Sequence, residues 1–189
     1  MISLVMDTSN SYLAVGLFQD NMCLEAFQEK GSRRQSEKAI PTLKEVLDRH
    51  HIALKDVNEM IITSGPGSYT GVRVAMTIAK TLAAVSDVRI KSVSSLAAYA
   101  GMSQALSVID ARGHKVFVGV YENGLPLIKE QVVALEDFAQ LRAEYGDFEL
   151  VGEIGCLGLD EKECDLCANI YALGQMACLL YTSDAADEL

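Results

Sequence analysis

A glycine-rich segment between two apolar stretches constrains the fold most. Residues 60–63 (Met-Ile-Ile-Thr) predict a buried strand, and the segment Gly65-Pro66-Gly67-Ser68-Tyr69-Thr70-Gly71 follows almost at once. An apolar stretch from Thr70 to Val85 then predicts a helix. A strand that leads through a tight turn into a helix is typical of α/β proteins.

The rest of the chain predicts two halves of similar pattern. Three short strands at 2–6, 12–18 and 22–29 form an antiparallel meander, followed by a helix at 36–51 that Ser36 caps. A strand at 90–93 and a short helix to residue 102, capped by Ser94 or Ser95, complete the first half. The second half predicts strands at 106–110, 116–121, 127–134 and 150–152, and helices at 136–144 and 167–180. Each half begins with a meander that contains an aspartate, Asp7 or Asp110.

This weak repeat predicts two similar lobes. We expect an N-terminal lobe over residues 1–102 and a C-terminal lobe over residues 103–180. The tail at 181–189 is small and acidic and lacks an apolar face, so we set it aside as a frayed end or a cloning remnant.

Composition and charge narrow the function classes. The 189 residues include 16 Lys and Arg against 26 Asp and Glu, a formal charge of −10, which disfavours unaided binding to nucleic acid or to an anionic membrane. No apolar run approaches the roughly 20 residues of a membrane helix, and no basic segment opens a signal peptide. The five cysteines are odd in number and scattered, so we expect no disulfide framework and a cytoplasmic location.

The glycine-rich turn has two interpretations. Its backbone N–H groups could bind a phosphate group, although Val72 and Arg73 stand where a Walker A motif has Lys and then Ser or Thr. Alternatively, it is a tight strand-to-helix turn that Ser68 or Thr70 caps. For the aspartate segments the alternative is an ordinary polar turn. The residues that would face a phosphate are Asp7, Ser9, Gly67, Ser68, Thr70, Arg73, Asp110 and Arg112.

Metal ligands and catalytic residues are not expected. Cys164 and Cys167 form a single C-x-x-C pair, whereas a structural zinc site needs four ligands, and the three histidines lack a suitable spacing. We expect buried structural thiols whose pKa the acidic residues 160–163 raise. No Ser-His-Asp set and no H-E-x-x-H motif is present, so the residues predict no catalytic group and no bound metal.

The stretch from Ile62 to Arg73, continued by residues 79–83, closely resembles the bacterial TsaB (YeaZ) family. Three further segments match that family in order and spacing: residues 6–9 (Met-Asp-Thr-Ser), residues 35–37 (Gln-Ser-Glu) with Pro41, and residues 110–112 (Asp-Ala-Arg). The resemblance covers about residues 2–135. It implies a two-lobed actin/Hsp70-like ATPase (ASKHA) fold with a reduced second lobe.

The resemblance also implies a function and partners. Members are non-catalytic scaffold subunits needed for N6-threonylcarbamoyladenosine at position 37 of tRNA, and they support a catalytic TsaD subunit together with the TsaE ATPase. A homodimer is implied for the chain alone, with tRNA contacted only through the complex. No cofactor is implied for the chain by itself, and ATP or ADP would lie at an interface of the complex.

Two other function classes stay open. TsaD holds a metal with two histidines on its first helix, where this chain has Gln35-Ser36-Glu37-Lys38-Ala39, so the departure argues against catalysis. A small ASKHA-type kinase or ATPase that uses Asp7 is one alternative. A metallopeptidase of the glycopeptidase type is the other, and the missing ligands disfavour it.

The predicted helix from Thr70 to Val85 carries two apolar stripes, whereas a helix on a sheet needs one. An uncovered stripe would mark an interface with a second copy or with TsaD, as the resemblance also implies. The alternative is that the helix at 36–51 covers it. The predicted interface residues are Ala39, Ile40, Leu43, Leu47, Val72, Val74, Ala75, Ile78, Ala79 and Leu82.

Overall fold

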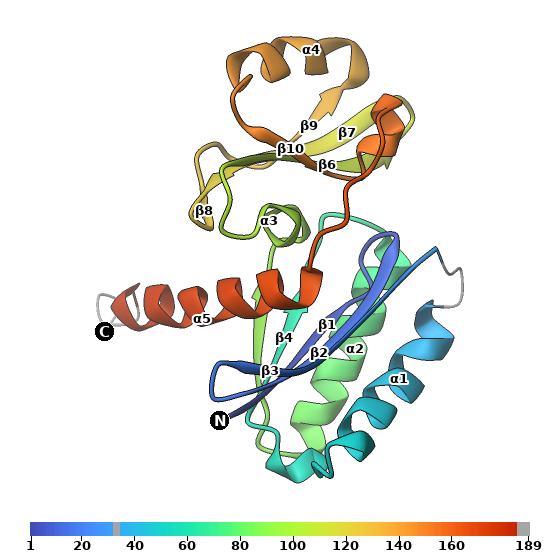
Figure 1. Ribbon diagram of the computed structural model, residues 1–189, viewed down its shortest axis with the longest axis vertical. Coiled ribbons are helices and arrows are strands. Elements are labelled where there is room, and N and C mark those ends of the chain that lie inside the picture. Colours follow the sequence, from blue (N-terminus) through green and yellow to red (C-terminus); the bar gives the residue numbers. More distant parts are fainter. Residues whose placement is uncertain (32–34, 185–189) are drawn as a thin grey trace.

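The computed structural model describes residues 1–31 and 35–184, and of residues 178–184 only the backbone. Figure 1 shows two lobes, one above the other, each built on a β-sheet. The lower sheet contains β1 (Ile2–Asp7), β2 (Tyr12–Gln19), β3 (Met22–Lys30), β4 (Glu59–Thr63) and β5 (Arg89–Val93) in the order β3-β2-β1-β4-β5. The meander pairs antiparallel, while β4 and β5 run parallel to β1.

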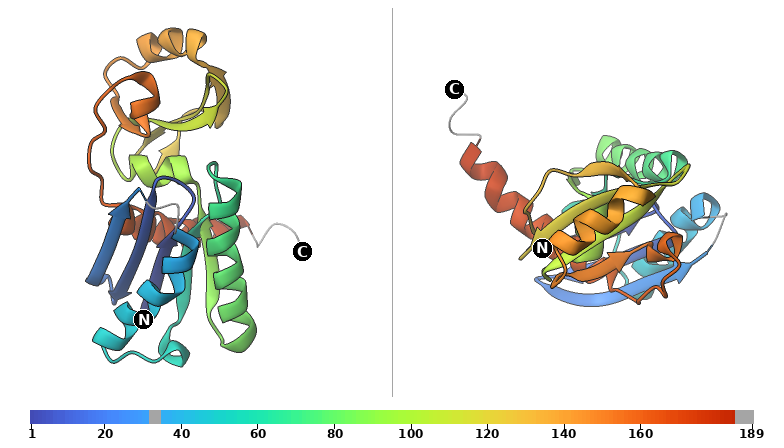
Figure 2. Two further views of the ribbon diagram at one scale, coloured as in Figure 1. Left: turned by 90° about the vertical axis from the view of Figure 1, so that its right-hand side faces the viewer. Right: turned by 90° about the horizontal axis from the view of Figure 1, so that it is seen from above.

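Helices cover both faces of the lower sheet. Helices α1 (Gln35–Arg49) and α2 (Tyr69–Val85) lie side by side on one face, and α5 (Leu166–Asp184) crosses the other (Figure 2). Side chains alternate along the strands, so Leu4 and Met6 pack towards α1 and α2 while Val5 packs towards α5. The lower sheet is therefore buried on both faces, with a core on each side.

Among the described residues, the upper sheet also has five strands, but fewer helices pack on it. Its strands are β6 (Ala105–Arg112), β7 (Lys115–Glu122), β8 (Leu125–Pro126), β9 (Gln131–Ala134) and β10 (Glu149–Gly152). As in the first lobe, the opening strand β6 has an antiparallel partner, β7, and a parallel one, β10. Helix α4 (Leu135–Glu144) packs on this sheet, and α3 (Ser95–Ala100) lies between the lobes. The chain has the two-lobed ASKHA fold with a reduced second lobe.

Most predicted elements are confirmed, and three boundaries are wrong. The predicted strand at 127–134 is only β9, because β8 ends at Pro126, which has no N–H to donate, and the chain leaves the sheet before β9 pairs with β7. Helix α1 begins at Gln35, so Ser36 lies inside it and is not its cap. Helix α5 continues through residues 181–184, part of the tail that we set aside, and residues 185–189 lie outside the described chain.

Two short 3₁₀ helices were not predicted. They are η1 (Leu54–Asp56) and η2 (Ile154–Leu157). The first lies between α1 and β4, and the second follows β10 directly. Cys156 of η2 lines the cleft between the lobes.

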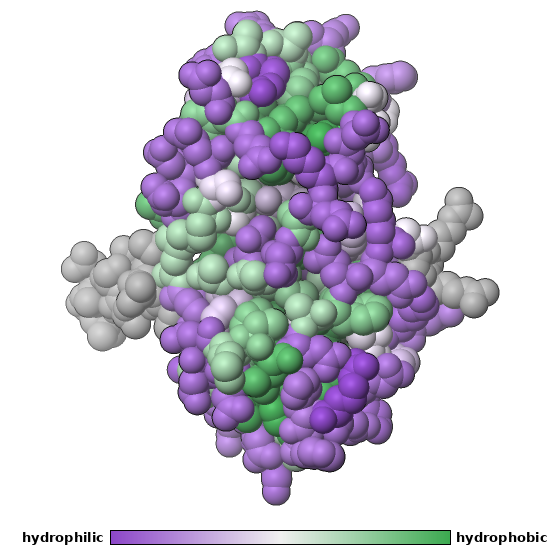
Figure 3. All heavy atoms as spheres, in the orientation of Figure 1, coloured by the Kyte–Doolittle hydropathy of each residue, from purple (hydrophilic) through white to green (hydrophobic). Residues whose placement is uncertain are grey.

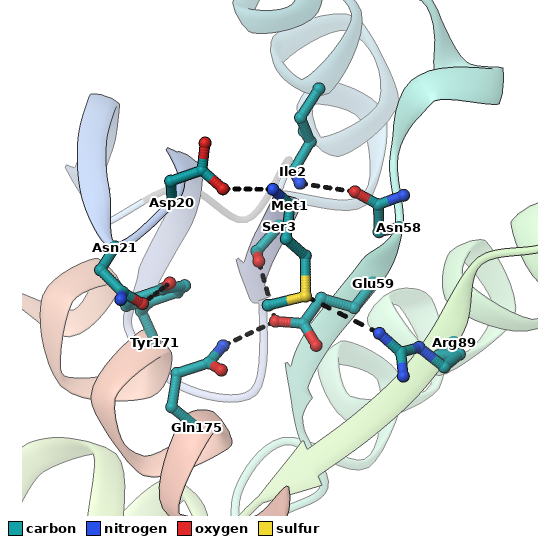
Figure 4. Close-up of polar contacts among 10 residues, drawn as sticks. All are labelled: Met1, Ile2, Ser3, Asp20, Asn21, Asn58, Glu59, Arg89, Tyr171 and Gln175. Carbon is teal, nitrogen blue, oxygen red and sulfur yellow. Dashed lines mark hydrogen bonds and ion pairs between the residues drawn. The ribbon is translucent and has the colours of Figure 1, made fainter.

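Helix α5 returns from the second lobe to the first sheet. Tyr171 stacks on Phe18 at 4.1 Å between ring centroids and donates a hydrogen bond to Asn21 Oδ1 at 2.8 Å. One turn further on, Gln175 Nε2 donates to Glu59 Oε1 at 2.6 Å (Figure 4). Polar and aromatic contacts thus fix the register of a helix that is apolar on several sides.

The outer surface is largely hydrophilic on the side that α5 crosses, with hydrophobic patches on both lobes (Figure 3). Within the described residues, no helix combines the length and apolarity that crossing a membrane requires.

Candidate functional site

A cleft of about 690 Å3 lies between the lobes. Four segments line it: the turn after β1, the glycine-rich turn before α2, the end of β6 with Phe117 of β7, and the segment after β10. The structure brings together six of the eight residues predicted to face a phosphate, and these come from both halves of the chain. They are Ser9, Gly67, Ser68, Thr70, Asp110 and Arg112.

Asp7 does not line this cleft. Its carboxylate is completely buried, and Oδ1 accepts hydrogen bonds from the Ser9 N–H and hydroxyl, both at 2.7 Å, and from Thr63 Oγ1 at 2.5 Å. Oδ2 accepts from Asn10 Nδ2 at 2.8 Å. Because donors of the chain itself occupy both oxygens, Asp7 ties the turn after β1 to β4.

Arg73 also lies outside the cleft. Its guanidinium stands over the Tyr69 ring, 5.2 Å from the centroid, and donates to the Tyr69 hydroxyl at 3.0 Å. The two residues are one helical turn apart, so the arginine points along the outer surface of α2.

The glycine-rich turn is explained by close backbone packing. A Cβ at Gly67 would lie 2.1 Å from the Ser9 carbonyl oxygen, and one at Gly71 would lie 1.8 Å from the Thr8 carbonyl oxygen. The Ser68 N–H donates to that Ser9 oxygen at 2.7 Å, and the Ser68 side chain caps α2 by accepting from the Gly71 N–H at 3.3 Å. The tight-turn interpretation is therefore confirmed, and the glycines permit the two turns to touch.

Two acidic residues in the cleft were missed from the sequence. Glu153 follows β10 and Glu161 follows η2, and both line the cleft beside Asp110. Among the charged residues described there, these three carboxylates face the single guanidinium of Arg112. Such a balance is unfavourable for a polyphosphate. The sequence signal that could have identified Glu153 is its position directly after the predicted strand at 150–152, which ends in a glycine.

Glu153 connects the two lobes. Its Oε1 accepts from the Ser11 N–H at 3.1 Å and from the Ser11 hydroxyl at 2.5 Å, while Oε2 accepts from the Asp110 N–H at 3.1 Å. Beside it, the Lys30 ammonium of β3 pairs with Glu161. The lobes are thus joined across the cleft by side chains as well as by the chain itself.

The four cysteines whose side chains the structure describes, Cys23, Cys156, Cys164 and Cys167, are free thiols. Burial, with Asp165 and Asp7 adding to it, raises the pKa of Cys164 to about 11. Burial also raises the pKa of Cys156, in the cleft, to about 11, with Asp110 next in effect. The predicted rise in thiol pKa is confirmed for Cys164, but the predicted cause is wrong, because burial comes first and Asp165 and Asp7 follow in place of residues 160–163. In the described part of the chain, no three His, Cys, Asp or Glu residues converge as metal ligands would.

The predicted interface residues divide into two groups. Six of them pack into the chain's own core between α1, α2 and the sheet, as the alternative interpretation expects: Ala39, Leu43, Leu47, Ala75, Ile78 and Ala79. These six residues therefore belong to the internal core and not to an open surface. Val72, Val74 and Leu82 are half-buried, and Ile40 is 60% exposed.

A shallow groove of about 340 Å3 runs between α1 and α2. Ile40 lies on its α1 side, and Tyr69, Arg73 and Val74 lie on its α2 side. Ile40 and Tyr69 are among the exposed large apolar residues, at 60% and 75% of their surface. The α1–α2 groove therefore exposes large apolar side chains beside the polar residues Ser36, Thr70 and Thr77.

Known proteins share both the sequence and this architecture. Residues 28–151 match the family TsaD: tRNA N6-adenosine threonylcarbamoyltransferase. The tRNA threonylcarbamoyladenosine biosynthesis protein TsaB of Bacillus subtilis is 33% identical over 153 residues, which are 76% of this chain and 67% of that protein. The chain belongs to the TsaB (YeaZ) family.

A second relative agrees with this TsaB-family assignment, and a solved structure shares the fold. The Escherichia coli TsaB protein is 31% identical over 132 residues, which cover 65% of this chain and 57% of that one. The solved structure of YeaZ from Pseudomonas aeruginosa superposes with a TM-score of 0.80 at 22% identity and covers 95% of this chain and 92% of that chain. This TsaB-family chain spans 57–67% of the length of the two curated relatives named here.

Proposed function

We propose that the chain is a non-catalytic subunit of the machinery that makes N6-threonylcarbamoyladenosine at position 37 of tRNA. In this role it binds and supports a TsaD-like catalytic subunit, together with a TsaE-like ATPase, and contacts tRNA only through the complex. Family membership supports the pathway, because the relatives are named for this biosynthesis. Alone, the chain would pair with a second copy of itself.

One observation carries the non-catalytic part of the proposal. The aspartate that ends the first strand, Asp7, has both carboxylate oxygens hydrogen-bonded to the chain's own hydroxyl and amide groups. The charged residues that line the cleft beside it are three carboxylates and one guanidinium among the described residues. A nucleotide bound there would have to place its phosphates against like charges, which costs free energy. ATP or ADP would accordingly bind at an interface of the complex.

The α1–α2 groove is the surface that we assign to the partner. Burial of a large aliphatic side chain contributes about 1.5–3 kcal/mol, so a charge at Ile40 should weaken binding by roughly tenfold or more. Because Ile40 is 60% exposed, Ile40→Glu should leave the fold intact. Met22 on β3 is exposed to 62%, and Met22→Glu makes the same kind of change away from the groove.

The test is titration of each variant with the purified TsaD-like subunit from the same genome, followed by calorimetry. We expect wild type and Met22→Glu to bind alike and Ile40→Glu to lose affinity. Equal binding by all three would contradict the surface assignment. Failure of the wild-type chain to bind, or to support threonylcarbamoyl transfer in a reconstituted reaction, would contradict the proposed function itself.

The volume and position of the cleft favour a second candidate, a small ASKHA-type ATPase. Steady-state ATP hydrolysis by the purified chain separates the two. Turnover that follows the protein peak across a final gel-filtration column would favour the ATPase.

A further inference from the structure

The position of Glu153 follows from the residue before it. Gly152 ends β10 opposite Val108 of the parallel strand β6, and its φ is +99°. A Cβ on Gly152 would lie 2.2 Å from the Val108 carbonyl oxygen, so only glycine fits. The Glu153 N–H then donates to that same oxygen at 2.8 Å. This close approach places the Glu153 side chain over the carboxyl ends of both strands, at the cleft.

The Glu153 carboxylate is bound by donors from both lobes. Oε1 accepts from the backbone N–H and the hydroxyl of Ser11, in the turn after β1, at 3.1 and 2.5 Å. Oε2 accepts from the backbone N–H of Asp110, within β6 of the second lobe, at 3.1 Å. A turn of the first lobe and a strand of the second thus present their amides to one anionic group.

Backbone N–H groups that converge from two turns form a binding position for an anion. Here the two donors belong to different lobes, so any anion that used both would also join the lobes. A carboxylate of the chain itself fills this position, and its negative charge would repel a second anion brought alongside it.

We propose that Glu153 is a built-in occupant of an anion-binding position between the lobes, which clasps the lobes together and keeps phosphate groups out. The lobes are then held in one arrangement without a nucleotide. The inference concerns the chain alone and does not depend on its proposed partners.

Two variants test this inference. Glu153→Ala removes the carboxylate and frees all three donors. Asp110→Asn is the matched control, because it removes one negative charge from the same cleft while keeping the backbone amide at 110. The Asp110 side chain accepts only a local hydrogen bond, from the Arg112 N–H at 2.7 Å, among the bonds described for it.

The first measurement is hydrogen exchange of the Ser11 and Asp110 amides in the full chain. We expect about tenfold faster exchange at both amides in Glu153→Ala, because each loses a charge-assisted hydrogen bond, and wild-type rates in Asp110→Asn. Unchanged exchange at both amides in Glu153→Ala would overturn the clasp.

The second measurement is titration with inorganic pyrophosphate, the probe for a phosphate-binding position. We expect Glu153→Ala to bind at least about tenfold more tightly than both wild type and Asp110→Asn. Equal affinity in wild type and Glu153→Ala would overturn the exclusion of phosphate. An equal gain in Asp110→Asn would overturn it too, because the net charge of the cleft would then set the affinity.

If circular dichroism shows that Glu153→Ala does not fold, Glu153→Gln replaces it, since a glutamine offers only one acceptor oxygen. That variant should then lose protection at one of the two amides, and full protection at both would overturn the inference.

Discussion

Removing the ammonium of Lys91 should leave the buried carboxylate of Glu59, beneath α5, without its ion-pair partner. Glu59 on β4 is completely buried, and its Oε1 accepts from Ser3 Oγ at 2.8 Å and from Gln175 Nε2 at 2.6 Å. Its Oε2 lies 2.7 Å from Lys91 Nζ, whose side chain is 14% exposed. In Lys91→Met the carboxylate keeps its two neutral donors and loses its only cationic partner among the residues described around it.

The magnitude follows from what remains. Removing one member of a buried ion pair costs roughly 3–5 kcal/mol, and a hydrogen bond to a charged group contributes about 1.5–3 kcal/mol. Because the Lys91 side chain is partly exposed and two donors stay in place, we expect a loss somewhat below that range, about 2–3 kcal/mol, at pH 7. Lys55→Met replaces an exposed lysine of η1 and should change stability by less than about 0.5 kcal/mol.

The pH dependence has a definite sign. Burial by itself would raise the pKa of Glu59, but Lys91, Ser3 and Gln175 outweigh it and hold that pKa below its ordinary value of 4.5. A lowered folded-state pKa stabilises the fold fully above pH 4.5, and this contribution is lost as pH falls through the folded pKa. Without Lys91, burial dominates and the pKa of Glu59 should rise above 4.5. Protonation of Glu59 at lower pH then reduces the loss of stability in Lys91→Met.

Urea unfolding at pH 7 and pH 5 measures this effect. The free-energy difference between wild type and Lys91→Met should be smaller at pH 5 than at pH 7, while Lys55→Met shows no such trend. The same loss at both pH values would refute the reasoning, because it would mean that the ammonium acts through packing and not through the charge of Glu59.

The other predictions concern backbone contact and burial. Gly71→Ala should cost about 3 kcal/mol in urea unfolding, since its Cβ would lie 1.8 Å from the Thr8 carbonyl oxygen; a loss under 1 kcal/mol would contradict that contact. Tyr99→Phe should raise the melting temperature, because the buried Tyr99 hydroxyl has no hydrogen-bond partner among the described residues, whereas Tyr121→Phe should lower it by removing a hydroxyl that donates to a carboxylate. A lower melting temperature for Tyr99→Phe would show that the hydroxyl is bonded. Leu43→Glu should unfold the monomer, as measured by circular dichroism, since Leu43 is 7% exposed. A folded variant would contradict the burial of Leu43 in the core.

The sequence by itself determined the local elements. Short apolar runs separated by polar turns predicted the strands within a residue or two, except the strand at 127–134, because alternation and turn residues act over a few positions. For α2 and α3 the sequence narrowed the cap to two residues each, since a cap depends only on the next few amides, and the structure selects Ser68 and Ser94. The resemblance to the TsaB family came from one contiguous string, so it too needed no knowledge of distant contacts.

Tertiary structure decided the contacts between distant residues. Helix α5 is apolar on several sides, so its pattern could not say which sheet it covers; Gly174 against Ile61 and Gln175 against Glu59 settle that choice. The stripe of α2 looked uncovered because nothing local reveals that Leu43 of α1 packs beside it.

The cleft shows the same division. The sequence predicted Asp7 and Asp110 in equivalent turns, yet only the fold reveals that Asp7 is buried under its own neighbours while Asp110 lies within β6 and faces solvent. Glu153 lies 142 residues from Ser11 in sequence and 2.5 Å from its hydroxyl in space. The sequence around a glutamate does not indicate which distant amide will donate a hydrogen bond to it. That hydrogen bond depends on how the two lobes pack, which only the folded chain defines.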